Sequence, residues 1–193
     1  MLSELLRAGR LSEHDLQLAA YAGDPAAGRI LGTADNQAGS PGAEEWLAGL
    51  RRWGYPALIA AALGALDLAI RGAAPSLELE EGAIAVRDAL AEWLSAPSAE
   101  TLVDWPVLAG TASEIAQETD DHAVRGVSLV ASYLGEAPGR TGLVPTAGFR
   151  LIQSDLRAGL RVMSSDLGLT PDQALAAMRE SVIRWAFRGR TRT

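Results

Sequence analysis

The chain has 193 residues, and 48% of them are hydrophobic, so it is long and apolar enough to bury one substantial core. It contains no cysteine, which excludes disulfides, thiolate metal sites and cysteine nucleophiles. Its 17 basic residues, all of them arginine, and its 24 acidic residues give a net charge of −7, which argues against nucleic-acid binding by the whole surface.

Three short helices are expected in a small N-terminal unit that covers residues 1–32. The first spans residues 2–9 and has its leucines on one side. Ser12 begins the second as an N-cap, with Asp15 three residues later in the manner of a capping box. Asp24 and the proline after it begin the third, because Asp is a favoured N-cap and Pro is favoured at the first helical position.

A polar segment rich in Gly, Pro and Ser separates this unit from the rest of the chain. It spans residues 33–42 and has no hydrophobic period, so we interpret it as a linker that crosses the surface. The main helical bundle is then expected over residues 43–188. A short basic tail, residues 189–193, is expected to be frayed.

The centre of the bundle is expected to be a nearly uncharged helix that begins at Pro56. One stripe of its surface consists of large apolar residues, and a second consists mostly of small ones: Ala57, Ala61, Gly64 and Leu68. Small residues allow another helix to approach closely, so this helix should have neighbours on two sides. An amphipathic helix that is capped by Ser76 and extends to Leu94 should pack against it.

The remaining segments also have helical periods, and none has the period of a strand. Amphipathic patterns predict helices over residues 43–53, 98–103, 105–119, 149–167 and 171–187. Asp120 or Asp121 caps one more helix, which a second long loop, residues 135–148, should follow. Thr170 begins the last helix with a capping pattern. About eight to eleven helices joined mostly by short loops predict an all-α fold, a single irregular multi-helix bundle.

One part of the chain resembles a group of helical proteins from GC-rich bacteria. The resemblance is carried by residues 16–27 (LQLAAYAGDPAA), by the apolar stretch 53–70 and by residues 83–94 (AIAVRDALAEWL). The same part, residues 10–95, is similar to helical immunity proteins of polymorphic toxin systems. This resemblance implies a non-enzymatic, protein-binding role, and it identifies no functional residue.

Basic residues are concentrated in the C-terminal third of the chain. Three lie on the outer face of the helix predicted at 149–167: Arg150, Arg157 and Arg161. Five more follow: Arg179, Arg184, Arg188, Arg190 and Arg192. The pattern is typical of a solvated face, and it also suits the binding of an acidic partner protein. We predict that the first three bind the partner. Trp46 or Trp105, near helix boundaries, is the candidate apolar anchor, although a core position is favoured for each.

A metal-binding helical enzyme is the main alternative. Glu114, Glu118 and His122 follow one another at intervals of four, and Asp121 lies beside them. In one continuous helix they would share a face and could offer carboxylate and imidazole ligands. The competing interpretation, which we favour, is a solvated face interrupted by an aspartate cap. A nucleic-acid accessory factor, bound through the C-terminal arginines, is the third hypothesis.

The expected function is therefore that of a protein–protein interaction module. It would be an immunity-type, accessory or scaffold protein of a bacterial conflict or assembly system, with no catalytic residue and no cofactor. Its partner would be a protein with an acidic patch, and a homo-oligomer is compatible with the sequence. The longest uncharged apolar run, residues 55–66, is shorter than the roughly 20 residues that a membrane span needs. We therefore expect no membrane span and a cytoplasmic location.

Overall fold

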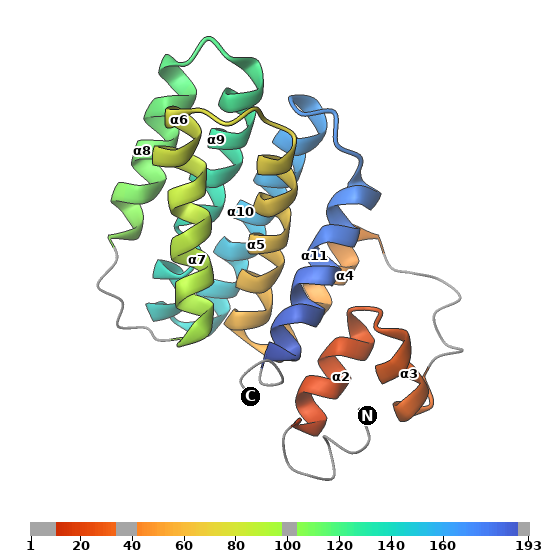
Figure 1. The fold of residues 1–193 in the computed structure, drawn as a ribbon. Coiled ribbons are helices and arrows are strands. Elements are labelled where there is room, and N and C mark those ends of the chain that lie inside the picture. The colour runs from red at the N-terminus through yellow and green to blue at the C-terminus, as the bar shows by residue number, and fades with distance from the viewer. Residues whose placement is uncertain (1–10, 34–41, 98–103, 189–193) are drawn as a thin grey trace.

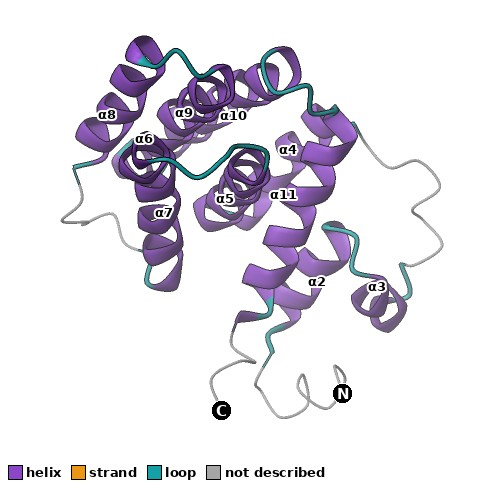
Figure 2. Cartoon of the chain, turned by 45° about the horizontal axis from the view of Figure 1, so that its top comes forward, coloured by secondary structure: helices purple, strands orange, loops and turns teal. Residues whose placement is uncertain are grey.

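The computed structural model describes residues 11–33, 42–97 and 104–188. These residues form helices and connecting segments without a strand, as Figure 1 and Figure 2 show, so the predicted all-α bundle is confirmed for this part of the chain. The helix expected at 2–9, nearly all of the linker at 33–42, the short helix at 98–103 and the basic tail lie outside it. Within the described ranges, no helix combines the length and the apolar character needed to cross a bilayer.

The helices follow one another in chain order. They are α2 (Glu13–Tyr21), α3 (Pro25–Leu31), α4 (Ala43–Leu50), the 3-10 turn η2 (Arg51–Trp53), α5 (Tyr55–Arg71), α6 (Leu77–Leu79), η3 (Glu80–Ile84), α7 (Ala85–Ser95), α8 (Trp105–Glu118), α9 (His122–Gly135), the 3-10 turn η4 (Gly139–Gly142), α10 (Pro145–Ser165) and α11 (Pro171–Ala186).

Most of the predicted helix starts are confirmed by side-chain caps. The hydroxyl of Ser12 accepts the backbone N–H of Asp15 at 3.0 Å. The carboxylate of Asp24 likewise accepts a backbone N–H at 2.7 Å and begins α3. At the start of α11, Thr170 and Gln173 form the full capping box, in which each side chain accepts the other residue's N–H. Caps are short-range interactions, which is why the sequence alone identifies them.

The amphipathic helix after α5 is interrupted by a π turn that the sequence did not predict. The turn is η3, and it separates α6 from α7. Gly82 lies within it, and a Cβ at this position would come within 2.9 Å of the Ile115 side chain on α8. Because a π turn adds one residue to the helical repeat, a search for the ordinary 3.6-residue period does not reveal it.

The helix α5 is the centre of the bundle. Figure 1 shows it between α7 on one side and α11 on the other, with α9 and α10 behind it, and all four contact it. It approaches α11 closely at Gly64, where a Cβ would lie 2.5 Å from the carbonyl oxygen of Ala177. The prediction that small residues on this helix admit close neighbours on two sides is confirmed.

The N-terminal hairpin α2–α3 joins the bundle through α2, which packs on α11. The Tyr21 hydroxyl donates a hydrogen bond to the carbonyl of Trp46 at 2.9 Å. Its ring is parallel to that of Trp46, with centroids 6.2 Å apart, and lies 4.5 Å from the ring of Trp53. The Arg52 guanidinium covers both Tyr21 and Trp53, at 4.4 and 3.9 Å from the ring centroids. An aromatic cluster therefore attaches the hairpin to α4 and η2.

Candidate functional site

The arginines predicted to bind a partner lie on the outer side of α10. Arg150 and Arg161 are exposed, and Arg157 is half-buried. In the described chain, none of the three forms an ion pair with a carboxylate. The Nε of Arg157 is buried and has no acceptor among the described residues. The exposed guanidinium groups of Arg150 and Arg161 thus retain hydrogen-bonding capacity for an external acidic group.

Contacts on both edges of α10 hold this helix in place. On the α4 side, the Gln153 amide donates a hydrogen bond to the carbonyl of Leu47 at 3.1 Å. Near its start, the ring of Phe149 stacks on Tyr55 of α5, with centroids 4.3 Å apart. The Tyr55 hydroxyl donates to the carbonyl of Pro145 at 3.3 Å. The outer face of α10 is therefore carried by a rigid element, as a preformed binding surface requires.

An ion-pair network ties α10 to the preceding turn. The Arg140 guanidinium contacts Asp155 of α10 at 2.6 Å and Glu136 at 2.8 Å. Burial raises the pKa of Asp155, the hydrogen bond and the charge of Arg140 lower it, and the charge of Glu136 raises it, with a net rise. Because Asp155 is engaged by Arg140 at the edge of the helix, it does not neutralise the arginines on the outer face.

Exposed apolar side chains lie beside these arginines. Val144 is 73% exposed, and Leu143 and Leu151 are exposed as well. Val144, Ala147 and Leu151 follow at intervals of three and four, so they share one side of the helix, next to the side that carries the arginines. We call the combined set the α10 surface: Leu143, Val144, Leu151, Arg150, Arg157 and Arg161.

The apolar half of this surface is not evident from the sequence. The sequence pattern predicts a long loop at residues 135–148, whereas α10 begins at Pro145 and so includes one more turn. A proline is well suited to the first turn of a helix, since its missing N–H would have no partner there. The signal that could have found the surface was the interval of seven residues between Val144 and Leu151, which lies off the core stripe of the helix.

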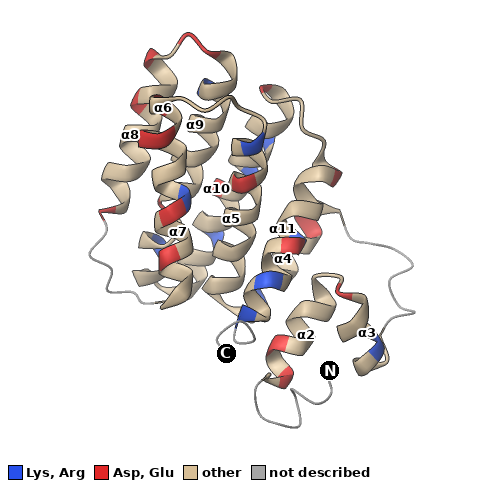
Figure 3. Ribbon diagram, in the orientation of Figure 1, with Lys and Arg blue, Asp and Glu red and all other residues tan. Residues whose placement is uncertain are grey.

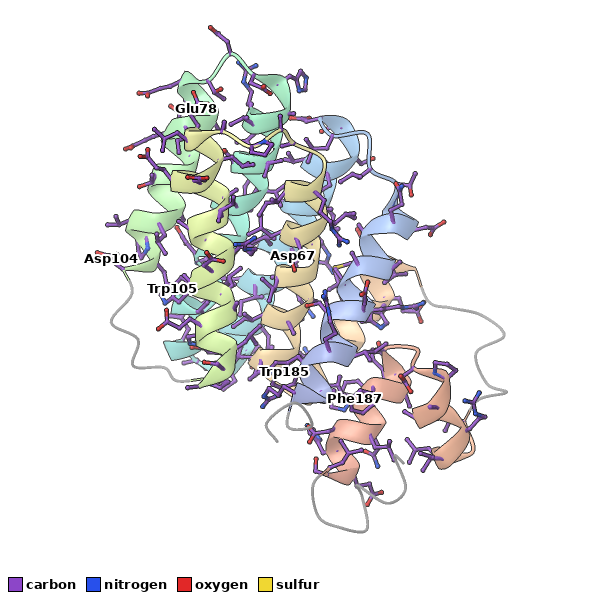
Figure 4. The ribbon with its side chains drawn as sticks, in the orientation of Figure 1. Asp67, Glu78, Asp104, Trp105, Trp185 and Phe187 are labelled. Atoms are coloured by element: carbon purple, nitrogen blue, oxygen red, sulfur yellow. The ribbon has the colours of Figure 1, made fainter. Side chains whose placement is uncertain are left out.

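Neither tryptophan proposed as an apolar anchor is available on the surface. Trp46 is 0% exposed and Trp105 is 3% exposed, so both belong to the core and neither offers an apolar anchor at the surface. Trp46 packs under Tyr21, and Trp105 lies at the start of α8, where Figure 4 labels it, against Gly139. The core interpretation that the sequence analysis favoured for each is confirmed.

The other C-terminal arginines are not gathered on the α10 surface. Arg179 lies 5.8 Å from the ring centroid of Trp46, and Arg188 lies 3.9 Å from that of Trp185. Arg184 is exposed on α11. Arg190 and Arg192 lie outside the described residues. The basic third of the sequence therefore divides over two helices, and only the part on α10 is combined with exposed apolar side chains.

The predicted metal site is not assembled. Glu114 and Glu118 belong to α8, which ends at Glu118, and His122 begins α9, so no single helix carries all of them. Asp121 caps α9 by accepting the backbone N–H groups of Ala123 and Val124 at 2.8 and 3.0 Å. In the described part of the chain, no group of three or more potential ligand side chains lies close enough to hold a metal ion.

The capping role of Asp121 leads to a direct prediction. Asp121→Ala should lower the free energy of unfolding by about 1 kcal/mol, because two N–H groups of α9 lose their acceptor. Its matched control is Asp120→Ala, since Asp120 is exposed and makes no described side-chain hydrogen bond, and this change should stay within about 0.5 kcal/mol. Urea unfolding of both variants measures the difference. Equal effects would show that Asp121 is not the cap.

No protein-family model matches the chain, and comparisons with curated proteins and with solved structures gave no match either. The class of molecule is therefore defined by its own features. It is an all-α bundle in which one long outer helix combines exposed apolar side chains with arginines that form no described ion pair.

Proposed function

We propose that this protein is a helical protein-binding module and that the α10 surface is its docking site. The observation that supports this most directly is that Val144, the N-cap of α10, and Leu151 are exposed beside Arg150 of the same firmly held helix. Apolar side chains next to arginine are typical of protein interfaces, in which arginine is enriched and lysine is depleted.

The chemistry of the α10 surface specifies the partner. The arginines require carboxylates opposite them, and the exposed valine and leucines require an apolar strip alongside those carboxylates. An acidic, amphipathic protein segment has both. Binding would act by covering the partner's surface or by holding it in an assembly. The resemblance of residues 10–95 implies an immunity-type role. In that role the partner would be a toxin, and binding would cover the toxin's surface.

A pull-down from lysate of the native host tests this function. The nuclease-treated lysate is passed over the tagged protein and over the variant Arg150→Glu/Arg161→Glu. Both side chains are exposed, so the variant should fold normally, which its melting curve checks. The wild type should retain a stoichiometric protein, and the variant should lose at least about 90% of it, because like charges across an interface cost several kcal/mol.

The matched control has the same change in net charge on other helices. Arg29→Glu/Arg184→Glu reverses two exposed arginines on α3 and α11 and should retain the partner. Equal retention by all three proteins would contradict the assignment of the α10 surface. Recovery of nucleic acid in place of a protein from a parallel lysate without nuclease, lost steeply with added salt, would favour a nucleic-acid accessory factor instead.

A further inference from the structure

A second charged face lies on the other side of the bundle. Residues 76–97 and 104–121 carry ten acidic side chains and one arginine, whereas residues 139–188 carry seven arginines and four acidic residues. Figure 3 shows acidic positions along α6, α7 and α8. Figure 4 labels Glu78 near the top of this side, at α6, and Asp104 at the lower end of α8, so acidic residues lie along the length of α8.

The exposed carboxylates of this side lie in rows on two neighbouring helices. Glu81, Asp88 and Glu92 follow the outer side of η3 and α7, and Glu114 and Glu118 follow that of α8. We call the combined set the acidic face: Glu78, Glu81, Asp88, Glu92, Glu114 and Glu118. Asp88 is paired with Arg87 at 2.6 Å. The five glutamates form no ion pair with any described arginine.

Apolar side chains are exposed on the acidic face as well. Leu77 is 67% exposed and directly precedes Glu78, and Val107 is 59% exposed on α8. With Val144 they are the most exposed large hydrophobic residues of the described chain. The acidic face therefore has the two features that the α10 surface requires of its partner, which are carboxylates without an intramolecular ion pair and exposed aliphatic groups.

The two surfaces point away from each other. The helices α5 and α9 contact both α7 and α10, and so lie between them. Figure 2 shows α7 and α10 on opposite sides of this central pair. A contact between the two surfaces within one molecule is therefore excluded by the fold, whereas a contact between two molecules leaves the opposite surface of each free.

We propose that the α10 surface binds the acidic face of a second copy of this chain, in a head-to-tail arrangement. This inference rests on the proposed function of the α10 surface as a protein docking site, and it names the partner. The inference is based on charge complementarity, since the arginines of the α10 surface and the glutamates of the acidic face form no described ion pair within the molecule. Because the two surfaces differ, the contact is heterologous. Further copies can therefore join at either end until the rotation between successive copies closes a ring.

The net charge of −7 sets the conditions under which the copies associate. Whole molecules repel one another at very low salt, whereas at about physiological ionic strength the screening length is roughly 8 Å. Screening by salt then reduces the repulsion between distant charges, and it weakens ion pairs in direct contact less. Association should therefore be strongest at intermediate salt and decrease again at high salt.

Sedimentation velocity over a wide range of protein concentration tests the proposal with two variants. One has the α10 surface reversed, Arg150→Glu/Arg161→Glu. The other has the acidic face neutralised, Glu92→Gln/Glu114→Gln/Glu118→Gln, at three exposed positions. The wild type should form species larger than a dimer. Each variant alone should associate at least about tenfold more weakly, because each has lost one of the two complementary surfaces.

A mixture of the two variants is the decisive sample. Each contributes the surface that the other lacks, so an equimolar mixture should form a dimer and nothing larger. Glu44→Arg/Glu180→Arg, which changes exposed acids on α4 and α11, is the control and should assemble as the wild type does. Melting curves of all proteins verify that the substitutions leave the fold intact.

Three results would overturn the inference. The first is a wild type that stays monomeric at every concentration and salt. The second is association that persists unchanged in both variants. The third is a closed dimer that only the α10 variant abolishes, which would mean that two α10 surfaces face each other. In the first case, loss of a host protein from the α10 variant in the pull-down would still support the proposed function, so the two failures are distinguishable.

Discussion

Replacing Gly64 by Ala is expected to lower the free energy of unfolding by about 2 to 3 kcal/mol. A Cβ at this position would lie 2.5 Å from the Ala177 carbonyl oxygen and 2.7 Å from the Ser181 Cβ, so α11 must move away from α5. The loss exceeds the gain of roughly 1 kcal/mol that Ala has over Gly in helix propensity. Chemical denaturation of the variant measures the net effect.

The control for this prediction is Gly110→Ala in α8. A Cβ there has no heavy atom within 4 Å, so only the propensity gain remains. This variant should be more stable than the wild type by about 0.5 to 1 kcal/mol. If the two Gly→Ala changes alter the free energy of unfolding in opposite directions, then contact between helices, and not backbone freedom, decides the outcome. A neutral or stabilising Gly64→Ala would mean that α5 and α11 are not in close contact.

Replacing Trp46 by Ala is expected to have the largest effect of any single change considered, a loss of about 3 to 5 kcal/mol. The side chain is 0% exposed, supports the ring of Tyr21 and packs near Arg179. Its loss opens a cavity where α4, α11 and the N-terminal hairpin meet. Denaturation gives the total effect, and hydrogen exchange should show that the amides of α2 lose protection first.

One further variant separates the contributions at this junction, and a second variant, on the α10 surface, is the control. Tyr21→Phe removes the hydrogen bond to the Trp46 carbonyl and should cost about 1 kcal/mol. Val144→Ala truncates a side chain that is 73% exposed and should change stability by less than about 0.5 kcal/mol. If Trp46→Ala were as mild as Val144→Ala, Trp46 would not be a core residue, and its earlier assignment as an interface anchor would regain support.

The basic half of the α10 surface could be predicted from the sequence, and the apolar half could not. The row formed by Arg150, Arg157 and Arg161 could be predicted because residues four and seven apart share a helix face whatever the helix packs against. The apolar half of the same surface was missed because it depends on where α10 begins and on which of its sides the other helices leave uncovered. In the sequence Leu151 looks like an ordinary apolar position of the helix, and only in the folded chain is it exposed, at 38%.

The two tryptophans illustrate the same limit. Trp46 and Trp105 lie near helix boundaries, a position that is compatible with either burial or exposure. Trp46 is buried because Tyr21, from a helix that precedes it by 25 positions, covers it. Trp105 is buried next to the turn at Gly139, far along the chain. Contacts at such separations leave no pattern within a window of ten or twenty residues.

By itself, the sequence determined the helical class of the protein, most helix starts and the small-residue face of α5, since propensity, capping and periodicity act between residues at most one or two turns apart. Only the tertiary structure decided the π turn in η3, the burial of both tryptophans and the presence of an acidic and a basic face on opposite sides. These features depend on which helices cover one another, and burial depends on the arrangement of the whole chain, not on any one segment.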